Sequence, residues 1–319
     1  MRKMQAVAWA AFCAAGIASA QNYPAKAVRI IVPYPAGGTS DILSRLLSPK
    51  LNEAFGQPVV VDNRPGANGN IGADLVAKSA PDGYTMLIAD LGALAISPSI
   101  YKLPFDPLRD LAPVTMIAYS PHLLAVHPSV PVKTVKELIA LAKSKPGRLN
   151  FAVSSIGGAP HLAGVAFEAQ TGIKWTYIPY KGGADAIIGL ASGQADAIFN
   201  GMLATYPHVR SGKLKLIAVS SAKRLTAIPE VPTVAESGLS DFETGSWQGA
   251  VAAGGTPKDI IGRLNAELVR IFNTAEMKEN LAKQGAEVFT MTPEQLGNWL
   301  KKEIDKWAKI VKAANLKLE

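Results

Sequence analysis

The stretch VRIIVPYPAGGTSDILSR, residues 28–45, decides the fold expected for this chain. Its apolar, β-branched start predicts a buried strand, Gly37-Gly38 predicts a turn, and apolar residues at helical spacing after Asp41 predict a helix. The first turn of a helix has unpaired backbone N–H groups and a partial positive charge, so it binds anions readily. Because glycine lets a ligand approach the backbone closely, the junction predicts an anion site, although a plain strand-to-helix turn has the same pattern.

A second copy of this pattern follows about 120 residues later. A strand expected over 149–153 leads into Ser154-Ser155-Ile156-Gly157-Gly158, and a helix is expected over 161–170. Two such junctions, one in each of two domains, would let two helix N-termini face a shared cleft. This repetition is the main sequence argument for function.

The length and composition fit two α/β domains, because 319 residues with 48% hydrophobic content can form a sizeable core. Strands and helices alternate almost throughout the chain, which predicts open, largely parallel sheets. Loops at the carboxyl edge of such sheets are where ligands bind, and Asp90-Leu91-Gly92-Ala93 is expected to be one of these loops.

The first 20 residues are expected to be a cleaved secretory signal. Arg2 and Lys3 precede an apolar run, and Ala18-Ser19-Ala20 has the small-residue pattern of a cleavage site. An uncleaved membrane anchor is the alternative, but the run is too short to span a bilayer. The single cysteine, Cys13, lies in this segment, so no disulfide and no lipid anchor are expected in the exported protein.

The charge distribution argues against a nucleic-acid partner. The precursor has a net charge of +8, and 31 basic and 25 acidic residues remain after the signal, a net charge of +6. The basic residues are scattered or lie in the expected C-terminal helix, with no basic stripe interleaved with aromatics. His122 and His127 have no carboxylate partner at metal-ligand spacing, so neither a metal site nor a cofactor is expected.

A series of short motifs runs along the mature chain: Tyr34-Pro35-Ala36-Gly37-Gly38-x-x-Asp41, Asn63-Arg64-Pro65-Gly66-Ala67, Pro81-Asp82-Gly83-Tyr84-Thr85, His161-Leu162-Ala163-Gly164, Tyr180-Lys181-Gly182-Gly183, Gly193-Gln194-Ala195-Asp196 and Gly255-Thr256-Pro257. In this order they resemble the Bug family, the periplasmic solute receptors of tripartite tricarboxylate transporters. The resemblance implies a two-domain type II periplasmic-binding-protein fold, with two open, mostly parallel sheets, helices on both faces and a ligand cleft between the domains. It implies residues 21–124 with 247–319 as domain 1 and 125–246 as domain 2.

The resemblance also implies a carboxylate ligand held by two loops through backbone amides, hydroxyls and water. The expected ligand-binding residues lie in these loops and along the cleft: Tyr34, Ala36, Gly37, Gly38, Thr39, Ser40, Asp41, Asp90, Gly92, Ala93, Ser154, Ser155, Gly157, Gly158, His161, Tyr180, Lys181, Gly182, Asn200 and Trp247. Four positions depart from the family pattern. Ser155 stands where glycine is common, Gly158 where a hydroxyl is common, Asp90 where a small neutral or hydroxyl residue is common, and Asp185 where proline is usual. A carboxylate near the cleft would repel a polyacid or accept a donor from the ligand.

Several of these residues also have a structural interpretation. Asp41 would hold the loop as a helix cap, because an anion would avoid its charge. Trp247 could be core packing instead of an apolar floor, Lys181 could be a solvated loop residue, and His161 could be a neutral structural side chain.

The expected function is that of a non-catalytic, monomeric receptor that passes a small carboxylate to membrane transporter subunits or to a signalling partner. An exported carboxylate-processing hydrolase is the alternative. The mature chain lacks a G-x-S-x-G motif, an H-E-x-x-H motif and a nucleophilic cysteine, which disfavours an enzyme. A dicarboxylate, an aromatic carboxylate and an amino acid all remain open as ligands.

Overall fold

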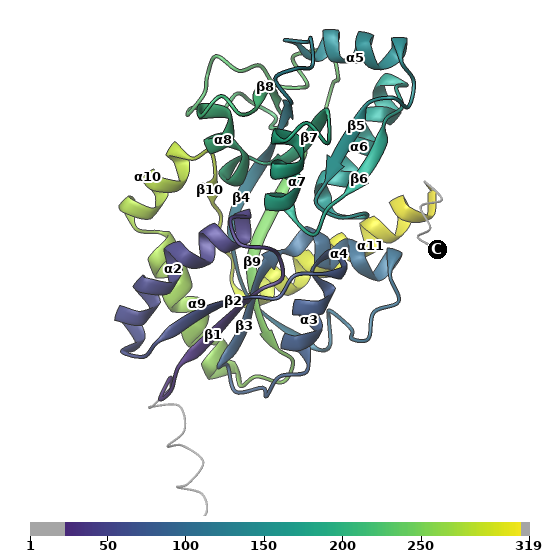
Figure 1. Cartoon of the computed structure of the whole chain (residues 1–319). Helices are drawn as coiled ribbons and strands as arrows, with labels where there is room; N and C mark the ends of the chain where they lie inside the picture. Colours follow the sequence, from purple (N-terminus) through teal and green to yellow (C-terminus); the bar gives the residue numbers. More distant parts are fainter. Residues whose placement is uncertain (1–22, 314–319) are drawn as a thin grey trace, which may run out of the picture.

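The computed structural model describes residues 23–313 and forms two lobes joined by long strands (Figure 1). The expected signal segment and Cys13 lie outside the described residues. The strand order is β2-β1-β3-β9-β4-β7-β5-β6, with β10 (Glu287–Val288) and β8 each paired to β4. The mixed α/β architecture agrees with the expected fold class.

The first lobe is built on the opening strand. β1 (Val28–Val32) lies between β2 (Val59–Asn63) and β3 (Thr85–Asp90), and both pairings are parallel. The helices of this lobe are α2 (Thr39–Phe55), α3 (Asn70–Ala77), α4 (Leu91–Ile100), α9 (Lys258–Phe272), α10 (Ala275–Lys283) and α11 (Pro293–Ala313), and a short helix, η1 (Ala67–Gly69), precedes α3.

The second lobe repeats this arrangement. β5 (Asn150–Val153) lies between β6 (Thr176–Pro179) and β7 (Ala197–Gly201), again in parallel. Its helices are α5 (Val135–Ser144), α6 (Ala159–Thr171), α7 (Gly183–Ala191) and α8 (Met202–Arg210), and β8 (Lys215–Val219) completes the sheet.

Two long strands connect the lobes. β4 (Leu111–Val126) pairs with β9 (Gly245–Ala253) along residues 111–121 and with β7 and β8 along residues 122–126. Pro121, which has no N–H to donate, lies where β4 changes partners. All pairings of β4 and β9 are antiparallel, so the expected parallel order holds only in the outer strands of each lobe.

Separate hydrophobic cores support each lobe. Leu43, Leu47 and Ile88 belong to the core of the first lobe, whereas Leu124, Phe151 and Phe199 belong to that of the second. The cores separate near the boundaries expected from the sequence, at residues 124 and 247, and those boundaries remain our proposal for the two domains.

Local sequence explains most helix starts. Thr134 caps α5 by accepting from Glu137 N at 3.2 Å, and Thr292 and Gln295 form a reciprocal capping box at α11. Thr274 caps α10 by accepting from Met277 N at 3.3 Å. Residues 91–93, expected to be a loop, form the first turn of α4, because the Asp90 carboxylate caps this helix.

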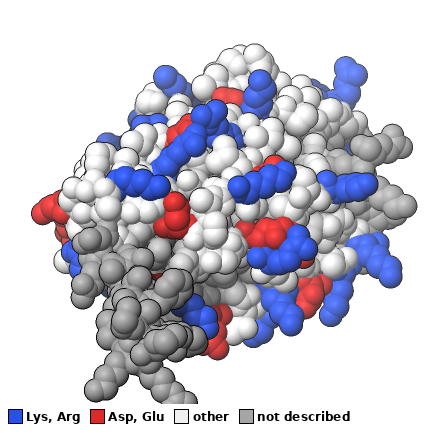
Figure 2. Space-filling model, turned by 90° about the horizontal axis from the view of Figure 1, so that it is seen from below, with Lys and Arg blue, Asp and Glu red and all other residues white. Residues whose placement is uncertain are grey.

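Lysines and arginines are spread between acidic residues over the face shown in Figure 2. In the described part of the chain, no helix combines the length and apolarity needed to span a membrane. Within residues 23–313, no group of three or more His, Cys, Asp or Glu side chains could hold a metal ion.

Candidate functional site

A cavity lies between the two lobes, beside the connecting strands, and has about 490 Å³ of empty space counted to its open mouth. Residues from both lobes and from β9 line it: Tyr34, Gly38, Thr39, Ser40, Asn68, Asp90, Ala93, Ser154, Gly158, Ala159, Pro160, Gly183, Asn200, Gly201, Ser246 and Gln248.

Five helices begin at this cavity. The first turns of α2 and α6 line it from opposite lobes, and the starts of α4, α7 and α8 line it through Asp90, Gly183 and Gly201. Each helix N-terminus has unpaired amides and a partial positive charge. The cavity therefore attracts negative charge without a cationic side chain.

The junctions before α2 and α6 have nearly the same backbone. Gly38 caps α2 with φ −78° and ψ 167°, and Gly158 caps α6 with φ −80° and ψ 165°. Gly37 and Gly157 precede them with φ of 85° and 78°, where glycine is favoured. Neither cap makes a side-chain hydrogen bond, so no cap oxygen competes for the first amides of either helix.

Each junction is held by the third residue of its helix. Asp41 Oδ2 accepts from Gly37 N at 2.9 Å, and His161 Nδ1 accepts from Gly157 N at 3.0 Å. Both side chains are buried, and neither lines the cavity. Burial lowers the pKa of His161 to about 4, so its ring is neutral at pH 7 and can accept this bond.

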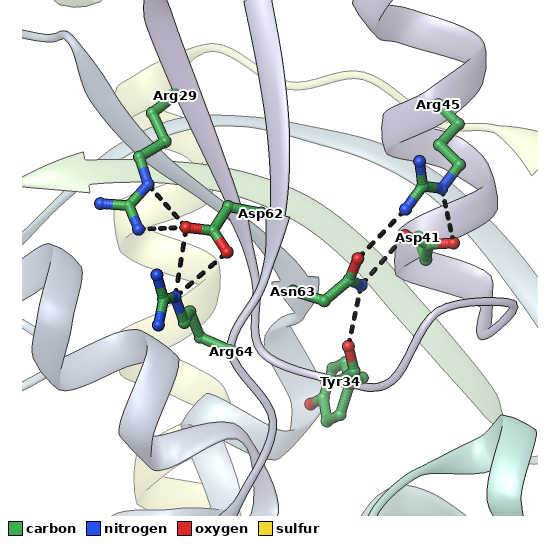
Figure 3. Close-up of polar contacts among 7 residues, drawn as sticks. All are labelled: Arg29, Tyr34, Asp41, Arg45, Asp62, Asn63 and Arg64. Carbon is green, nitrogen blue, oxygen red and sulfur yellow. Dashed lines mark hydrogen bonds and ion pairs between the residues drawn. The ribbon is translucent and has the colours of Figure 1, made fainter.

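A polar network anchors the junction before α2 (Figure 3). Asn63 Nδ2 donates to Tyr34 O and to Asp41 Oδ1, each at 3.0 Å, and Arg45 Nε donates to Asp41 Oδ2 at 2.9 Å. Burial alone would raise the pKa of Asp41, but the bonds from Arg45, Gly37 and Asn63 outweigh it and lower the pKa. Asp41 therefore stays ionised and fixes the loop.

The cavity wall supplies neutral donors and a single charged side chain, Asp90. None of the lining residues given above is lysine, arginine or histidine. Burial, and secondly the charge of Asp90, raise the pKa of the Tyr34 phenol, which keeps its proton as a donor. Gln248 Oε1 accepts from Ser40 Oγ at 2.6 Å, which directs the Gln248 amide on β9 toward α2.

Asp90 lies at the start of α4 and is 8% exposed. Its Oδ1 accepts from Gly92 N at 3.0 Å. Burial raises the pKa of this carboxyl to about 6, against the opposing effect of the Ser246 hydroxyl and the amides of Gly92, Trp247 and Ala93. The group is therefore mainly ionised at pH 7.

Contacts across the cavity join the two lobes. Ser155 Oγ donates to Asn68 Oδ1, and Tyr101 Oη donates to Ile156 O at 2.6 Å. Both bonds link the loop before α6 to elements of the first lobe. They hold the second junction against the first lobe.

Nine of the residues expected from the sequence line this cavity: Tyr34, Gly38, Thr39, Ser40, Asp90, Ala93, Ser154, Gly158 and Asn200. The others lie beside it or point elsewhere: Ala36, Gly37, Asp41, Gly92, Ser155, Gly157, His161, Tyr180, Lys181, Gly182 and Trp247. Tyr180 donates to Gln194 at 3.4 Å within the second lobe, and Lys181 is exposed. Trp247 packs against Tyr119, with ring centroids 4.5 Å apart.

Sequence reasoning missed seven lining residues: Asn68, Ala159, Pro160, Gly183, Gly201, Ser246 and Gln248. Strand alternation could have found two of them. On a strand, the interpretation of Trp247 as core packing places its neighbours Ser246 and Gln248 on the opposite face, toward the cavity. Asn68 gave no such signal, because its glycine-rich loop resembles any tight turn.

Comparison with known proteins agrees with this geometry. The model of the tripartite tricarboxylate transporter family receptor matches residues 43–316. The chain belongs to this family. Protein BugT of Bordetella pertussis is similar to it, with 38% identity over 324 residues that cover 100% of this chain and 99% of BugT.

Solved structures of this receptor family superpose closely on the chain. The R. palustris protein Rpa4515 with adipate has a TM-score of 0.90 and 36% identity, and covers 93% of this chain and 100% of its own. The periplasmic binding protein BugD has a TM-score of 0.88 and 34% identity over the same shares. MatC from Rhodopseudomonas palustris with bound malate has a TM-score of 0.85 and 30% identity, and covers 91% of this chain and 100% of its own.

Proposed function

We propose that this protein is a periplasmic solute-binding receptor that captures a small carboxylate between its lobes and delivers it to a tripartite tricarboxylate-type membrane transporter. One observation carries the proposal: the first turns of α2 and α6, from opposite lobes, line a single cavity that no basic side chain lines. The ligand would receive hydrogen bonds from the amides of these turns and from Tyr34, Thr39 and Ser154. Rpa4515 was solved with adipate and MatC with malate, which supports this ligand class.

The receptor is expected to act as a monomer, without a cofactor, and to close around its ligand by bending where β4 and β9 join the lobes. Binding that involves both lobes would favour the closed form, because only there can one molecule reach both helix N-termini. The closed form is the state that we propose the transporter recognises.

A binding screen tests the proposal. The purified protein is heated with single carboxylates, including adipate, malate, succinate and an aromatic acid, and hits are confirmed by calorimetry. At least one carboxylate is expected to raise the unfolding temperature and to bind with a stoichiometry of one. Chromatography after long incubation must return the ligand unchanged. Conversion of the ligand would favour the hydrolase, and no binding by any carboxylate would refute the receptor.

A further inference from the structure

The cavity contains a fixed negative charge that a receptor for simple polyacids does not need. Asp90 is the only charged side chain among its lining residues. The carboxylate is tied to the start of α4 by the Gly92 amide at 3.0 Å, so it cannot swing out to solvent without uncapping the helix. The positive end of α4 is thus already neutralised by the protein itself.

Charged groups beside the cavity do not compensate Asp90: Lys181, before α7, is exposed and does not line the cavity. Arg45, in the first lobe, is paired with Asp41, and neither residue lines the cavity. His161 on α6 and His122 on β4 are buried, which lowers their pKa to about 4 and about 3, so both are neutral at pH 7. Tyr34 remains protonated, as described above. The side chains at the cavity therefore have a net charge of −1.

A second anionic group on the ligand would meet this charge inside a small cavity. Two carboxylates at hydrogen-bond range in a partly buried site repel each other, so a diacid would bind only after Asp90 takes up a proton. With a pKa of about 6, this protonation weakens diacid binding by about tenfold at pH 7. A cationic nitrogen would instead be attracted to Asp90. The carboxylate end of the same ligand would still have the free amides of α2 and α6.

We propose that Asp90 is the specificity-determining residue of the site and receives an ammonium group, so that the preferred ligand is an amino-carboxylate with a carboxylate at its other end. The inference rests on the proposed receptor function and refines its ligand class. Asp90 would neutralise the cationic end, whereas the α2 and α6 turns would bind the anionic end.

The proposal predicts opposite pH dependences for the two ligand classes. Because burial raises the pKa of Asp90 to about 6, its charge changes within an accessible range. An ammonium ligand needs the ionised form, so its affinity must rise as the pH increases through 6. A diacid needs the protonated form, so its affinity must fall over the same range.

The experiment compares length-matched pairs by calorimetry on the purified protein: 4-aminobutyrate with succinate, 5-aminopentanoate with glutarate, and 6-aminohexanoate with adipate. At pH about 7.5, well above the pKa of Asp90, at least one amino acid is expected to bind about tenfold or more tightly than its matched diacid. Asp90→Asn keeps an oxygen that can cap α4 and removes the charge. It is expected to reverse the preference within the pair and to abolish its dependence on pH.

The control is Asp259→Asn, which removes an exposed carboxylate from the first turn of α9, outside the cavity. It must leave the preference unchanged. If diacids and amino acids both bind and Asp90→Asn alters neither their order nor their pH profile, the role of Asp90 is refuted while the receptor function stands. If neither series binds although malate or the aromatic acid of the screen does, this inference fails while the receptor function stands; if no carboxylate of the series or of the screen binds, both fail.

Discussion

Replacing Gly38 with serine separates helix stability from ligand binding. Gly38 has φ −78° and ψ 167°, a conformation open to any residue, and a Cβ placed there meets only the Pro35 carbonyl oxygen, at 3.5 Å. A serine at this N-cap can accept a hydrogen bond from the amide of Ser40 or Asp41. The new hydroxyl would therefore occupy an amide that we assign to the ligand.

The expected effects have opposite signs. Serine is a better N-cap than glycine by a few tenths of a kcal/mol, so the unfolding temperature should stay level or rise by about one degree. The ligand carboxylate would lose one charge-assisted hydrogen bond, worth about 1.5–3 kcal/mol, so its dissociation constant should rise by about ten- to a hundredfold.

Calorimetric titration with the best carboxylate from the screen, alongside thermal unfolding, measures both effects. Gly38→Ala adds the Cβ without an acceptor and should bind more tightly than Gly38→Ser. Gly262→Ser, at an exposed helix glycine with no atom within 4 Å of the added Cβ, should bind as the wild type does. Wild-type affinity in Gly38→Ser, or equal losses in the serine and alanine variants, would show that the ligand does not use these amides.

Three further predictions follow from the same geometry. Ser154→Ala should weaken carboxylate binding by about 1 kcal/mol, or roughly fivefold, by calorimetry, because a cavity hydroxyl is lost; unchanged affinity would remove Ser154 from the site. Asn63→Ala should lower the free energy of unfolding in urea by about 1–3 kcal/mol, since Asp41 and Tyr34 O lose their donor; a smaller loss would mean that the network in Figure 3 does not hold the loop. Because burial lowers the pKa of His161 to about 4, the unfolded chain binds its proton first, and stability should fall by up to roughly 3 kcal/mol as the pH drops from the unfolded pKa toward 4. His161→Gln should flatten this pH dependence, and an identical profile in the variant would contradict the assignment.

The sequence predicted some helices well and missed others. The helix expected after Asp41 is present as α2, because its apolar spacing and turn residues are local signals. The α4 helix was missed because its cap, Asp90, was interpreted as part of a ligand loop. The α8 helix was not expected, since its sequence MLATYPHVR has a proline near its end and little amphipathic spacing.

The repeated strand, Gly-Gly and helix pattern determined, from the sequence alone, that two junctions of the same kind exist and, to within about three residues, where each helix begins. Both conclusions follow from local signals: the backbone conformations that glycine allows and the spacing of apolar residues along the chain. Only the tertiary structure decided that both junctions open into one cavity, that Ser246 and Gln248 face it instead of Trp247, and that Asp90 is its single charged side chain. Those facts depend on how β4 and β9 join the lobes. Distances between residues far apart in the chain follow from strand pairing and packing, which no local pattern specifies.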